Sequence, residues 1–350
     1  MQNETISSHA IRQVAVLGSG MAGLTVALRL RERGVSVNVF EKSRGPGGRL
    51  ASTRVTAGTV DCGAQYFTIR TSAFGEFLAR YAGDSYGLWQ GRLARQAESG
   101  GREPFTPARR YVGVPRMSAV SRALASQLVI RTRCQVTRLG RTSSGQWQLE
   151  DSRGELHGGF DAVVVTAPPV QTEALFRQSG LGCAANRVLP LTATLQACYA
   201  VMVHFAEPLG LPFEGLESPA GPLRWAANDS SKPGRTGRGE WWVLHGAPAW
   251  SREHVGSAPD TVIASLLAEF QRLAPVTASP DQALSHCWLY ARFHGPGAHD
   301  PIWFPDDRLG VCGDWLQGGR VEGAFESAER LLAVMTLDTR RHPLDRSAAQ

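Results

Sequence analysis

Lysine is almost missing from this 350-residue sequence, which places only Lys42 and Lys232 among its 37 basic side chains. The arginines that make up the rest are scattered along the chain, are opposed by 31 acidic side chains and form no long block of like charge. The net charge of +6 therefore does not indicate a nucleic-acid surface. We interpret the preference for arginine as a codon-composition bias, with a few arginines available to an anionic ligand.

Long apolar runs are absent as well. No stretch approaches the roughly 18 consecutive apolar residues that a membrane span needs. The N-terminus, MQNETISSHAIRQ, has neither a basic start nor an apolar segment. We therefore expect no membrane span and no secretory signal, and we expect residues 1–10 and 338–350 to be tails.

The six cysteines form no CxxC pair and no cysteine–histidine pattern with metal-ligand spacing. Most occur in apolar contexts such as QACYAVMV and LGVCGDW, where a thiol usually behaves as a small buried hydrophobe. The sequence therefore predicts neither a metal site nor a disulfide framework. A reducing cytoplasm fits this cysteine usage best.

What the sequence does contain is glycine in two closely spaced loops. The first, GSGMAG at 18–23, follows an apolar segment at 14–17 and precedes an amphipathic segment that runs to Gly34. This order predicts a strand, a tight turn and a helix, and a second strand ends at Glu41, so the fingerprint stands in the βαβ unit that it requires. The turn lets a pyrophosphate approach the backbone and the helix start, while Glu41 is placed to accept ribose hydroxyls.

The second glycine loop, RGPGGR at 44–49, is more than an ordinary NAD dehydrogenase needs. It suits a longer ligand whose diphosphate and second sugar continue past the ribose, which points to FAD. Gly47 and Gly48 permit backbone contact, and Arg44 and Arg49 supply charge. A glycine-rich hairpin without a ligand remains an alternative. Because no second GxGxxG stands in a βαβ unit, we expect no separate NADPH-binding domain.

The remaining patterns predict an α/β protein in two parts. We expect helices at 72–82, within 113–128 and at 258–275, strands across 129–165, at 196–208 and at 240–251, a polar loop at 228–239, and a strand, turn and helix over 309–335. The last of these has the same order of strand, glycine turn and helix as the N-terminal nucleotide-binding segment. Both ends of the chain should therefore form one Rossmann-like FAD-binding domain. The expected division gives 11–72, 107–170 and 284–337 to this domain, and 73–106 and 171–283 to an inserted substrate domain of mixed sheet and helices.

Several longer segments resemble one family of flavoproteins. They include EKSRGPGGRLAS (41–52), DCGAQYFT (61–68), WVLHGAPAWS (242–251), WLYAR (288–292) and GVCGDWLQGGRVEGAFES (310–327). Together they are similar to the flavin-containing amine oxidase superfamily and, more narrowly, to its renalase-like branch, in family order over roughly residues 11–335. The sequence departs from the pattern at ESAER, where relatives commonly have Ser-Gly, and at Asn228-Asp229, which puts the substrate contacts in doubt.

The resemblance implies a fold of the amine-oxidase and p-hydroxybenzoate-hydroxylase type and non-covalent FAD. Glu41 should hold the ribose, Arg49 the middle of the cofactor and Asp314 its ribityl or diphosphate, although Asp314 could instead be an ordinary helix cap. The amides of 321–324 should face the flavin pyrimidine. The full set of expected cofactor residues is Gly18, Gly20, Met21, Ala22, Gly23, Glu41, Lys42, Gly48, Arg49, Gly63, Ala64, Gln65, Ala167, Gly313, Asp314, Val321, Glu322 and Ala324.

The implied substrate pocket is aromatic, with His245 as a polar contact to a nicotinamide. Its expected residues are Gln65, Tyr66, Trp225, Asn228, Trp242, His245, Trp288 and Tyr290. Individually, a tryptophan or histidine of this kind could equally well be an ordinary core residue.

The resemblance implies an oxidase that takes hydride from 1,2- or 1,6-dihydro-NAD(P) to flavin N5, with dioxygen reduced to hydrogen peroxide and no catalytic acid or base. Amine oxidation is the first rival, and the family's amine oxidases commonly place a lysine beside N5. We expect no such lysine here, because Lys42 belongs to the adenosine end and Lys232 to the polar loop. A non-catalytic flavoprotein that binds a partner, and an oxygenase or desaturase, remain further alternatives.

Overall fold

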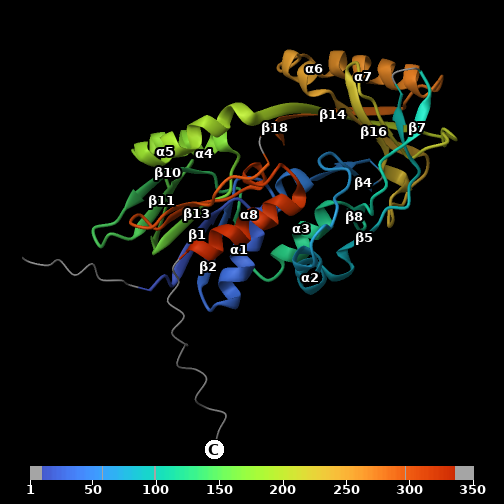
Figure 1. Cartoon of the computed structure of the whole chain (residues 1–350). Helices are drawn as coiled ribbons and strands as arrows, with labels where there is room; N and C mark the ends of the chain where they lie inside the picture. Colours follow the sequence, from blue (N-terminus) through green and yellow to red (C-terminus); the bar gives the residue numbers. More distant parts are fainter. Residues whose placement is uncertain (1–9, 57, 98–99, 296, 336–350) are drawn as a thin grey trace, which may run out of the picture.

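The structure, a computed structural model, describes residues 10–335 apart from 57, 98–99 and 296, so the expected tails lie almost wholly outside the described residues. Segments from both ends of that range form a six-stranded sheet in the order β19-β20-β13-β1-β2-β9, parallel except for the edge strand β19. Its strands are β1 Gln13–Leu17, β2 Ser36–Glu41, β9 Val129–Thr132, β13 Ala162–Val165, β19 Ile302–Phe304 and β20 Leu309–Val311. Figure 1 accordingly shows the blue start and red end of the chain side by side.

Both faces of this sheet are covered, as parallel strands require. On β1, Val14 and Val16 pack toward the helices of one face, whereas Ala15 and Leu17 pack toward the other. The first face carries α1 Met21–Glu32, α2 Ser72–Tyr81, α3 Ser118–Ala125 and α8 Val321–Val334. The second carries a three-stranded sheet and two helices: β10 Val136–Arg141, β11 Trp147–Asp151, β12 Leu156–Phe160, α4 Pro169–Gln178 and α5 Gly182–Val188.

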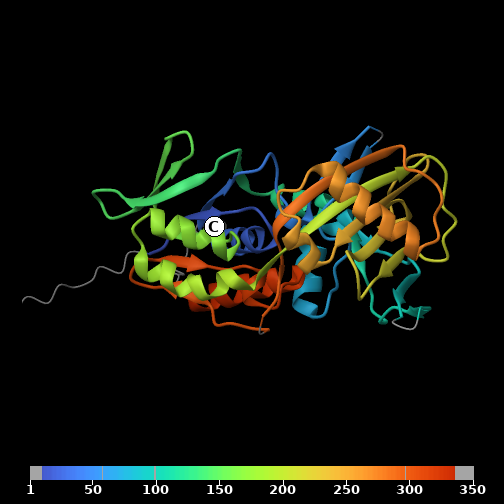
Figure 2. The same cartoon turned by 90° about the horizontal axis from the view of Figure 1, so that it is seen from above.

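The middle of the chain forms a seven-stranded sheet in the order β18-β14-β17-β16-β15-β6-β7. Its strands are β6 Leu93–Gln96, β7 Arg102–Pro104, β14 Leu195–Phe205, β15 Gly215–Glu217, β16 Leu223–Asn228, β17 Glu240–Gly246 and β18 Gln282–Phe293. Helices α6 Pro248–Glu253 and α7 Pro259–Leu273 lie over its outer face. Seen from above, this part forms one half of the molecule and the nucleotide-binding part the other (Figure 2).

The remaining elements are short. They are the hairpin β3 Ser52–Val55 and β4 Gly58–Asp61, the pair β5 Tyr86–Leu88 and β8 Tyr111–Gly113, and the 3-10 turns Gly48–Leu50, Gly83–Ser85, Leu189–Thr194, Asp229–Ser231 and Asp314–Leu316. The expected Rossmann-like α/β fold with an inserted mixed-sheet part is therefore confirmed.

Three details differ from the expected division of the chain. Helix α2 packs against α8 of the nucleotide-binding half, where Phe74 and Phe325 have ring centroids 5.2 Å apart. Helices α4 and α5 also pack on that half, whereas β18 stays in the seven-stranded sheet up to Phe293. The expected division puts 73–82 and 171–188 in the inserted part and 284–293 outside it, because sequence patterns show that an element exists but not the face on which it packs.

The expected strand at 240–251 was too long, because β17 ends at Gly246 and α6 begins at Pro248. Proline has no N–H for a sheet ladder, and its fixed φ suits the first position of a helix. Within the part of the chain that the structure describes, no helix is both long and apolar enough to cross a membrane.

Candidate active site

The first glycine loop folds as a pyrophosphate cradle. Gly18 has φ +104, and a Cβ on Gly23 would lie 2.0 Å from the carbonyl oxygen of Gly18. A Cβ on Gly20 would meet nothing within 4 Å, and Gly20, the residue before α1, gives the helix no side-chain cap. The first amides of α1 therefore have no capping side chain, and an anionic group can accept their hydrogen bonds.

The second glycine loop lies directly against the first. Gly47 donates its N–H to the carbonyl oxygen of Ser19 at 2.9 Å, and a Cβ on Gly48 would approach the Cα of Gly20 at 3.5 Å. The buried Glu41 carboxylate accepts bonds from Ser19 N and Oγ at 2.9 and 2.6 Å and from Ser43 N at 2.7 Å. One Glu41 oxygen thus receives a single hydrogen bond and can still accept a ribose hydroxyl.

The remaining expected cofactor residues extend this cradle along the carboxyl ends of the sheet. Arg49 pairs with Asp314 and donates to the carbonyl oxygen of Ala291 at 3.2 Å. Gly63 lies against the Arg49 backbone, where a Cβ would meet the carbonyl oxygen at 2.1 Å, and Ala64 donates to that oxygen. A ligand that starts at the α1 turn and runs past Arg49 would follow these segments, which fits the long FAD molecule.

At the start of α8, the first backbone amides are available to a ligand, but the side chain of Glu322 is not. Arg320 precedes the helix without a side-chain cap, so the amides at 321–323 have no capping side chain, whereas Ala324 donates its N–H to the carbonyl oxygen of Arg320 at 3.1 Å. The carboxylate of Glu322, in contrast, accepts bonds from Arg70 N, Thr71 N and Thr71 Oγ1 and fastens the start of α2. Only its backbone is left for a ligand.

The other expected cofactor residues occupy supporting positions. Lys42 donates to Gln171 at 3.3 Å, the carbonyl oxygen of Ala167 accepts the Thr172 hydroxyl at 3.0 Å, and Gly313 donates its N–H to Ser327 Oγ at 3.0 Å.

Gln65 lies beside a buried ionic cluster that the sequence did not reveal. Lys232 is fully buried, and its Nζ donates to Gln65 Oε1 at 3.0 Å, Asp61 Oδ2 at 3.1 Å and Asp229 Oδ1 at 2.7 Å. Arg235 pairs with Asp61 as well. We define these four charged residues (Asp61, Asp229, Lys232 and Arg235) as the ionic cluster.

Lys232 lies in the loop after Asn228, as expected, but its side chain is buried beside Gln65. Asn228 caps the 3-10 turn by accepting Ser231 N at 3.2 Å, and this turn directs Lys232 inward. The carboxylate of Asp61 comes from a hairpin 171 residues away, so no local pattern could show the pairing.

The two carboxyl groups of the ionic cluster differ in pKa. Burial alone would raise the pKa of Asp61, but Lys232 and Arg235 outweigh burial and lower it to about 2. Burial, together with the negative charge of Asp61, raises the pKa of Asp229 to about 6. Arg235 pairs closely with Asp61 but lies 3.8 Å from Asp229, so Asp229 is the carboxylate of the cluster that takes up a proton first as the pH falls below neutral.

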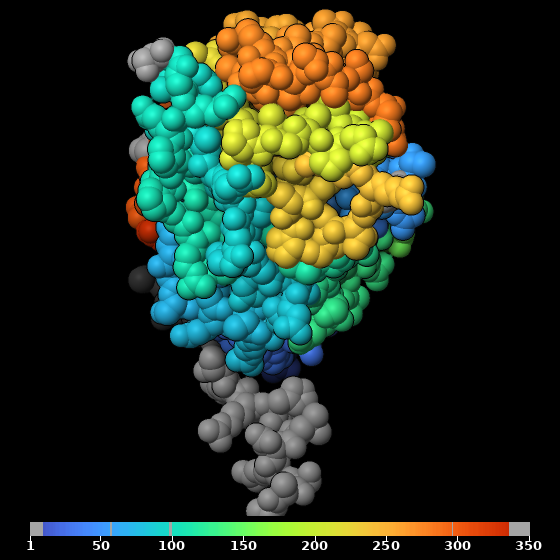
Figure 3. Space-filling model, turned by 90° about the vertical axis from the view of Figure 1, so that its right-hand side faces the viewer, coloured from blue at the N-terminus to red at the C-terminus, as the bar shows by residue number. Residues whose placement is uncertain are grey.

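Two of the expected aromatic residues, Tyr66 and Trp225, pack against each other. The Tyr66 ring lies 5.6 Å from Trp225 and 6.5 Å from Trp89, and Arg110 stacks over Tyr66 at 5.2 Å. In the space-filling view, blue atoms of the N-terminal half are visible in a gap between yellow-orange segments of the inserted half (Figure 3).

Trp225 and His245 are direct cross-strand partners on β16 and β17. Both side chains are buried, and Trp225 Nε1 and His245 Nε2 have no hydrogen-bond partner among the described residues. Burial, then the charges of Arg292 and Lys232, lowers the pKa of His245 to about 3, so its imidazole is neutral at ordinary pH. Buried polar atoms without partners are uncommon in proteins, so the pair is a candidate for contact with a polar ligand group.

Other expected pocket residues are placed differently. Trp242 lies on the opposite face of the sheet, packed against Phe213 and Phe270, and its indole donates to Glu240 at 3.0 Å. Because alternate residues of a strand face opposite sides, His245 and Trp242 cannot share a pocket, and we exclude Trp242. Asn228 uses its side chain as the turn cap described above.

Trp288 and Tyr290 lie half-buried on β18. The Trp288 indole donates to the carbonyl oxygen of Cys62 at 2.8 Å and so holds the loop that leads to Gln65.

Two protein-family models match this chain, and together they cover residues 16–331. A model described as "NAD(P)-binding Rossmann-like domain" matches residues 16–81, and one described as "Flavin containing amine oxidoreductase" matches 72–331. A hydroxyneurosporene desaturase from Rubrivivax gelatinosus is 43% identical over 58 residues, which are 17% of this chain and 11% of that protein. A zeta-carotene-forming phytoene desaturase from Myxococcus xanthus is 46% identical over 52 residues, 15% and 10% respectively. The chain thus matches only about a tenth of the length of these relatives.

Solved structures resemble the chain over nearly its full length. Cyclohexylamine oxidase from Brevibacterium oxydans IH-35A has a TM-score of 0.71 at 13% identity, covering 93% of this chain and 98% of that one. An oxidoreductase from Methanosarcina mazei has a TM-score of 0.68 at 16% identity, covering 92% and 100%. At this level of identity the likeness concerns the fold.

Proposed function

Because this chain belongs to the flavin-containing amine oxidoreductase family, we propose that it is a renalase-like oxidase of isomeric dihydro-NAD(P), with non-covalently held FAD. Its substrates would be the 1,2- or 1,6-dihydropyridine forms, its product NAD(P)+, and its final electron acceptor dioxygen, which leaves as hydrogen peroxide. The proposal rests on the narrow sequence matches around Gln65-Tyr66, His245 and Tyr290 and on one structural observation, the unpartnered pair of Trp225 and His245.

That pair suits a nicotinamide carboxamide. Indole Nε1 is only a donor, whereas a neutral imidazole nitrogen can accept. Trp225 Nε1 can therefore bind the carboxamide oxygen, and His245 Nε2 can accept from its NH2 group. The neighbouring Tyr66 and Trp225 rings supply flat apolar surface for the pyridine ring.

The proposed reaction requires the side chains to position the substrate but not to transfer a proton. Bound FAD would supply the hydride acceptor at N5 and the reactivity with dioxygen. Loss of hydride turns a dihydropyridine into an aromatic pyridinium, and no proton has to leave in that step, so no general base is required. The chain's own contribution is to position the pyridine ring, to bind the carboxamide and to keep His245 neutral.

Amine oxidation is the second candidate, and the buried Lys232 is the observation that favours it. A lysine next to Gln65 lies closer to the expected flavin position than the sequence suggested. However, all three N–H bonds of its ammonium group are directed at acceptors, two of them carboxylates. This arrangement holds Lys232 as a charged structural group and leaves no hydrogen free for a water or an amine.

The deciding experiment is anaerobic mixing of the purified flavoprotein with 1,2-dihydro-NAD, 1,6-dihydro-NAD, ordinary NADH and benzylamine, followed by flavin absorbance. We expect at least one isomeric dihydropyridine to bleach the flavin much faster than NADH or benzylamine does. Bleaching by the amine alone would overturn the proposal in favour of amine oxidation. Bleaching by none of the four would favour a desaturase or a non-catalytic flavoprotein.

A further inference from the structure

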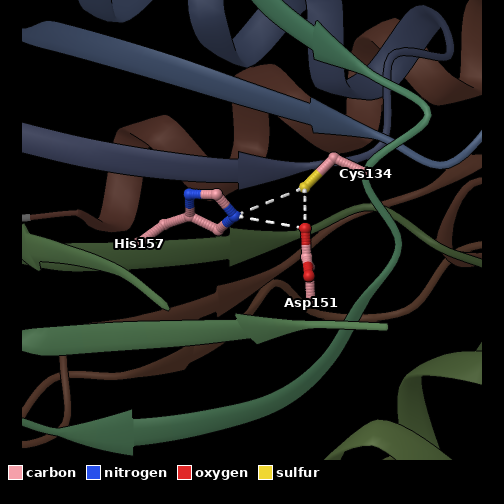
Figure 4. A group of neighbouring side chains, drawn as sticks. All are labelled: Cys134, Asp151 and His157. Atoms are coloured by element: carbon pink, nitrogen blue, oxygen red, sulfur yellow. Dashed lines mark hydrogen bonds and ion pairs between the residues drawn. The ribbon is translucent and has the colours of Figure 1, made fainter. Parts of the chain in front are cut away.

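Three side chains of metal-ligating type meet on the opposite side of the six-stranded sheet from α1. Cys134 follows β9, Asp151 ends β11 and His157 lies in β12 (Figure 4). Cys134 Sγ is 3.5 Å from Asp151 Oδ2 and 3.6 Å from His157 Nε2, and the latter two atoms are 3.5 Å apart. All three residues are buried, at 3%, 2% and 6% exposure.

We propose that Cys134, Asp151 and His157 form a binding site for a divalent cation of borderline softness, with Zn²⁺ as the best match. Zinc takes thiolate, imidazole and carboxylate ligands at about 2.0–2.3 Å in tetrahedral geometry, which separates the ligand atoms by roughly 3.3–3.6 Å. The three observed separations agree with that spacing. The mixed sulfur, nitrogen and oxygen set disfavours Mg²⁺ and Ca²⁺, which prefer oxygen. A fourth position is left to a water.

The ligands are held in place before any ion arrives. Asp151 Oδ1 accepts the amides of Arg153 and Glu155 at 2.8 and 3.1 Å, which leaves Oδ2 directed at the cysteine. Cys134 donates its own N–H to the carbonyl oxygen of Glu41 at 3.0 Å. The His157 ring packs against Phe40 with centroids 5.2 Å apart. Such outer contacts orient ligands in established metal sites.

The charges also balance. When zinc binds, the Cys134 thiol releases its proton to solvent as the Sγ–Zn bond forms. A thiolate, a carboxylate and a neutral imidazole then offset the two positive charges. Arg153, which now pairs with Asp151 Oδ2 at 3.0 Å, is 63% exposed and has Glu155 as a second partner at 3.4 Å, so it can move aside. His157 Nδ1 lies 3.4 Å from Arg131, whose side chain is 52% exposed and can move aside, and 3.6 Å from the carboxylate of Glu155, which can then accept a hydrogen bond from the Nδ1–H.

The first test measures zinc in the FAD-loaded protein by elemental analysis, after dialysis against ZnCl2 and then against metal-free buffer. We expect about one zinc per chain in the wild type, and the same in the matched control Cys198→Ser, which removes another buried thiol. Cys134→Ser and His157→Gln should lose the zinc. Equal retention of zinc by wild type and Cys134→Ser, or no retention by wild type, would overturn the proposal.

The second test needs no variant, so it stays decisive if a substitution prevents folding. X-ray absorption at the zinc edge of the loaded wild-type protein should show one sulfur at about 2.3 Å together with nitrogen and oxygen at about 2.0–2.2 Å. Zinc surrounded by nitrogen and oxygen alone would place it elsewhere, and the site would then be rejected.

Discussion

His245 shows how burial can set the role of a single residue. Its position on β17 places its side chain beside Trp225, on the face of the sheet that carries Trp241 and Val243. Burial, together with the nearby charges of Arg292 and Lys232, lowers its pKa to about 3. A histidine with so low a pKa carries no charge above about pH 4, so it can accept a hydrogen bond throughout the neutral range. The proposed role is therefore binding of the carboxamide and not proton transfer.

We predict that His245→Ala weakens substrate binding roughly two- to tenfold, the usual value of one neutral hydrogen bond, with a smaller change in the saturated rate of flavin reduction. That saturated rate in the wild type should be flat between about pH 5.5 and 9, because the histidine does not titrate there. Stopped-flow reduction without oxygen measures both, with the exposed His294→Ala as control. A rate that rises through about pH 6.5 in wild type but not in His245→Ala would show that His245 acts as a base.

At the scale of elements, alternate side chains of β17 point to opposite faces of the seven-stranded sheet and serve different purposes. Trp241, Val243 and His245 face the nucleotide-binding half, whereas Trp242 and Leu244 face α7 and its core residues. The same strand thus builds a candidate binding surface on one side and a hydrophobic core on the other.

We predict that Trp242→Ala lowers the free energy of unfolding by about 3–5 kcal/mol, the usual cost of removing a large buried aromatic side chain. Trp242→Phe should lose less, because it keeps a ring against Phe270. Urea unfolding of the FAD-loaded variants measures the difference. If Trp242→Phe instead weakened substrate binding at unchanged stability, the assignment of Trp242 to the core would fail.

At the scale of the whole molecule, the ionic cluster joins the two halves. Asp61 ends the β3–β4 hairpin, whereas Asp229, Lys232 and Arg235 come from the turn and loop after β16. Two positive and two negative side chains are taken out of water together, an arrangement that is costly to break because a single loss leaves a buried charge uncompensated.

The cluster makes stability depend on pH through Asp229. Because the folded-state pKa of Asp229 is raised to about 6, the native state binds its proton more tightly than the unfolded chain does. The resulting stabilisation is fully present below about pH 4 and is lost as the pH rises through about 6. Asp61, with a pKa of about 2, does not titrate in this window.

We therefore predict that the melting temperature of wild type, taken relative to Asp229→Asn, falls as the pH rises from about 5 to 7.5. Thermal unfolding at fixed ionic strength and FAD concentration measures it. Asp306→Asn, an exposed carboxyl, is the matched control and should track wild type at every pH. A difference between wild type and Asp229→Asn that stays constant or grows with pH would contradict the raised pKa.

The sequence by itself determined the βαβ unit, both glycine loops and Glu41, because each depends on residues close together in the chain and on the steric limits of the backbone. It also predicted an inserted sheet, and it indicated flavin chemistry through local motifs. The strand alternation that excludes Trp242 was already present in WVLH, but the spacing could not show which face of β17 points inward.

Only the tertiary structure decided which distant side chains meet. Lys232 belongs to a polar stretch, yet a short turn and Asp61, 171 residues away, bury it. Cys134 and His157 are 23 residues apart with no motif between them, and the register of β10, β11 and β12 brings them together with Asp151. Buried charge and ligand sets arise from long-range strand pairing, since the energy that holds them depends on partners that no local segment contains.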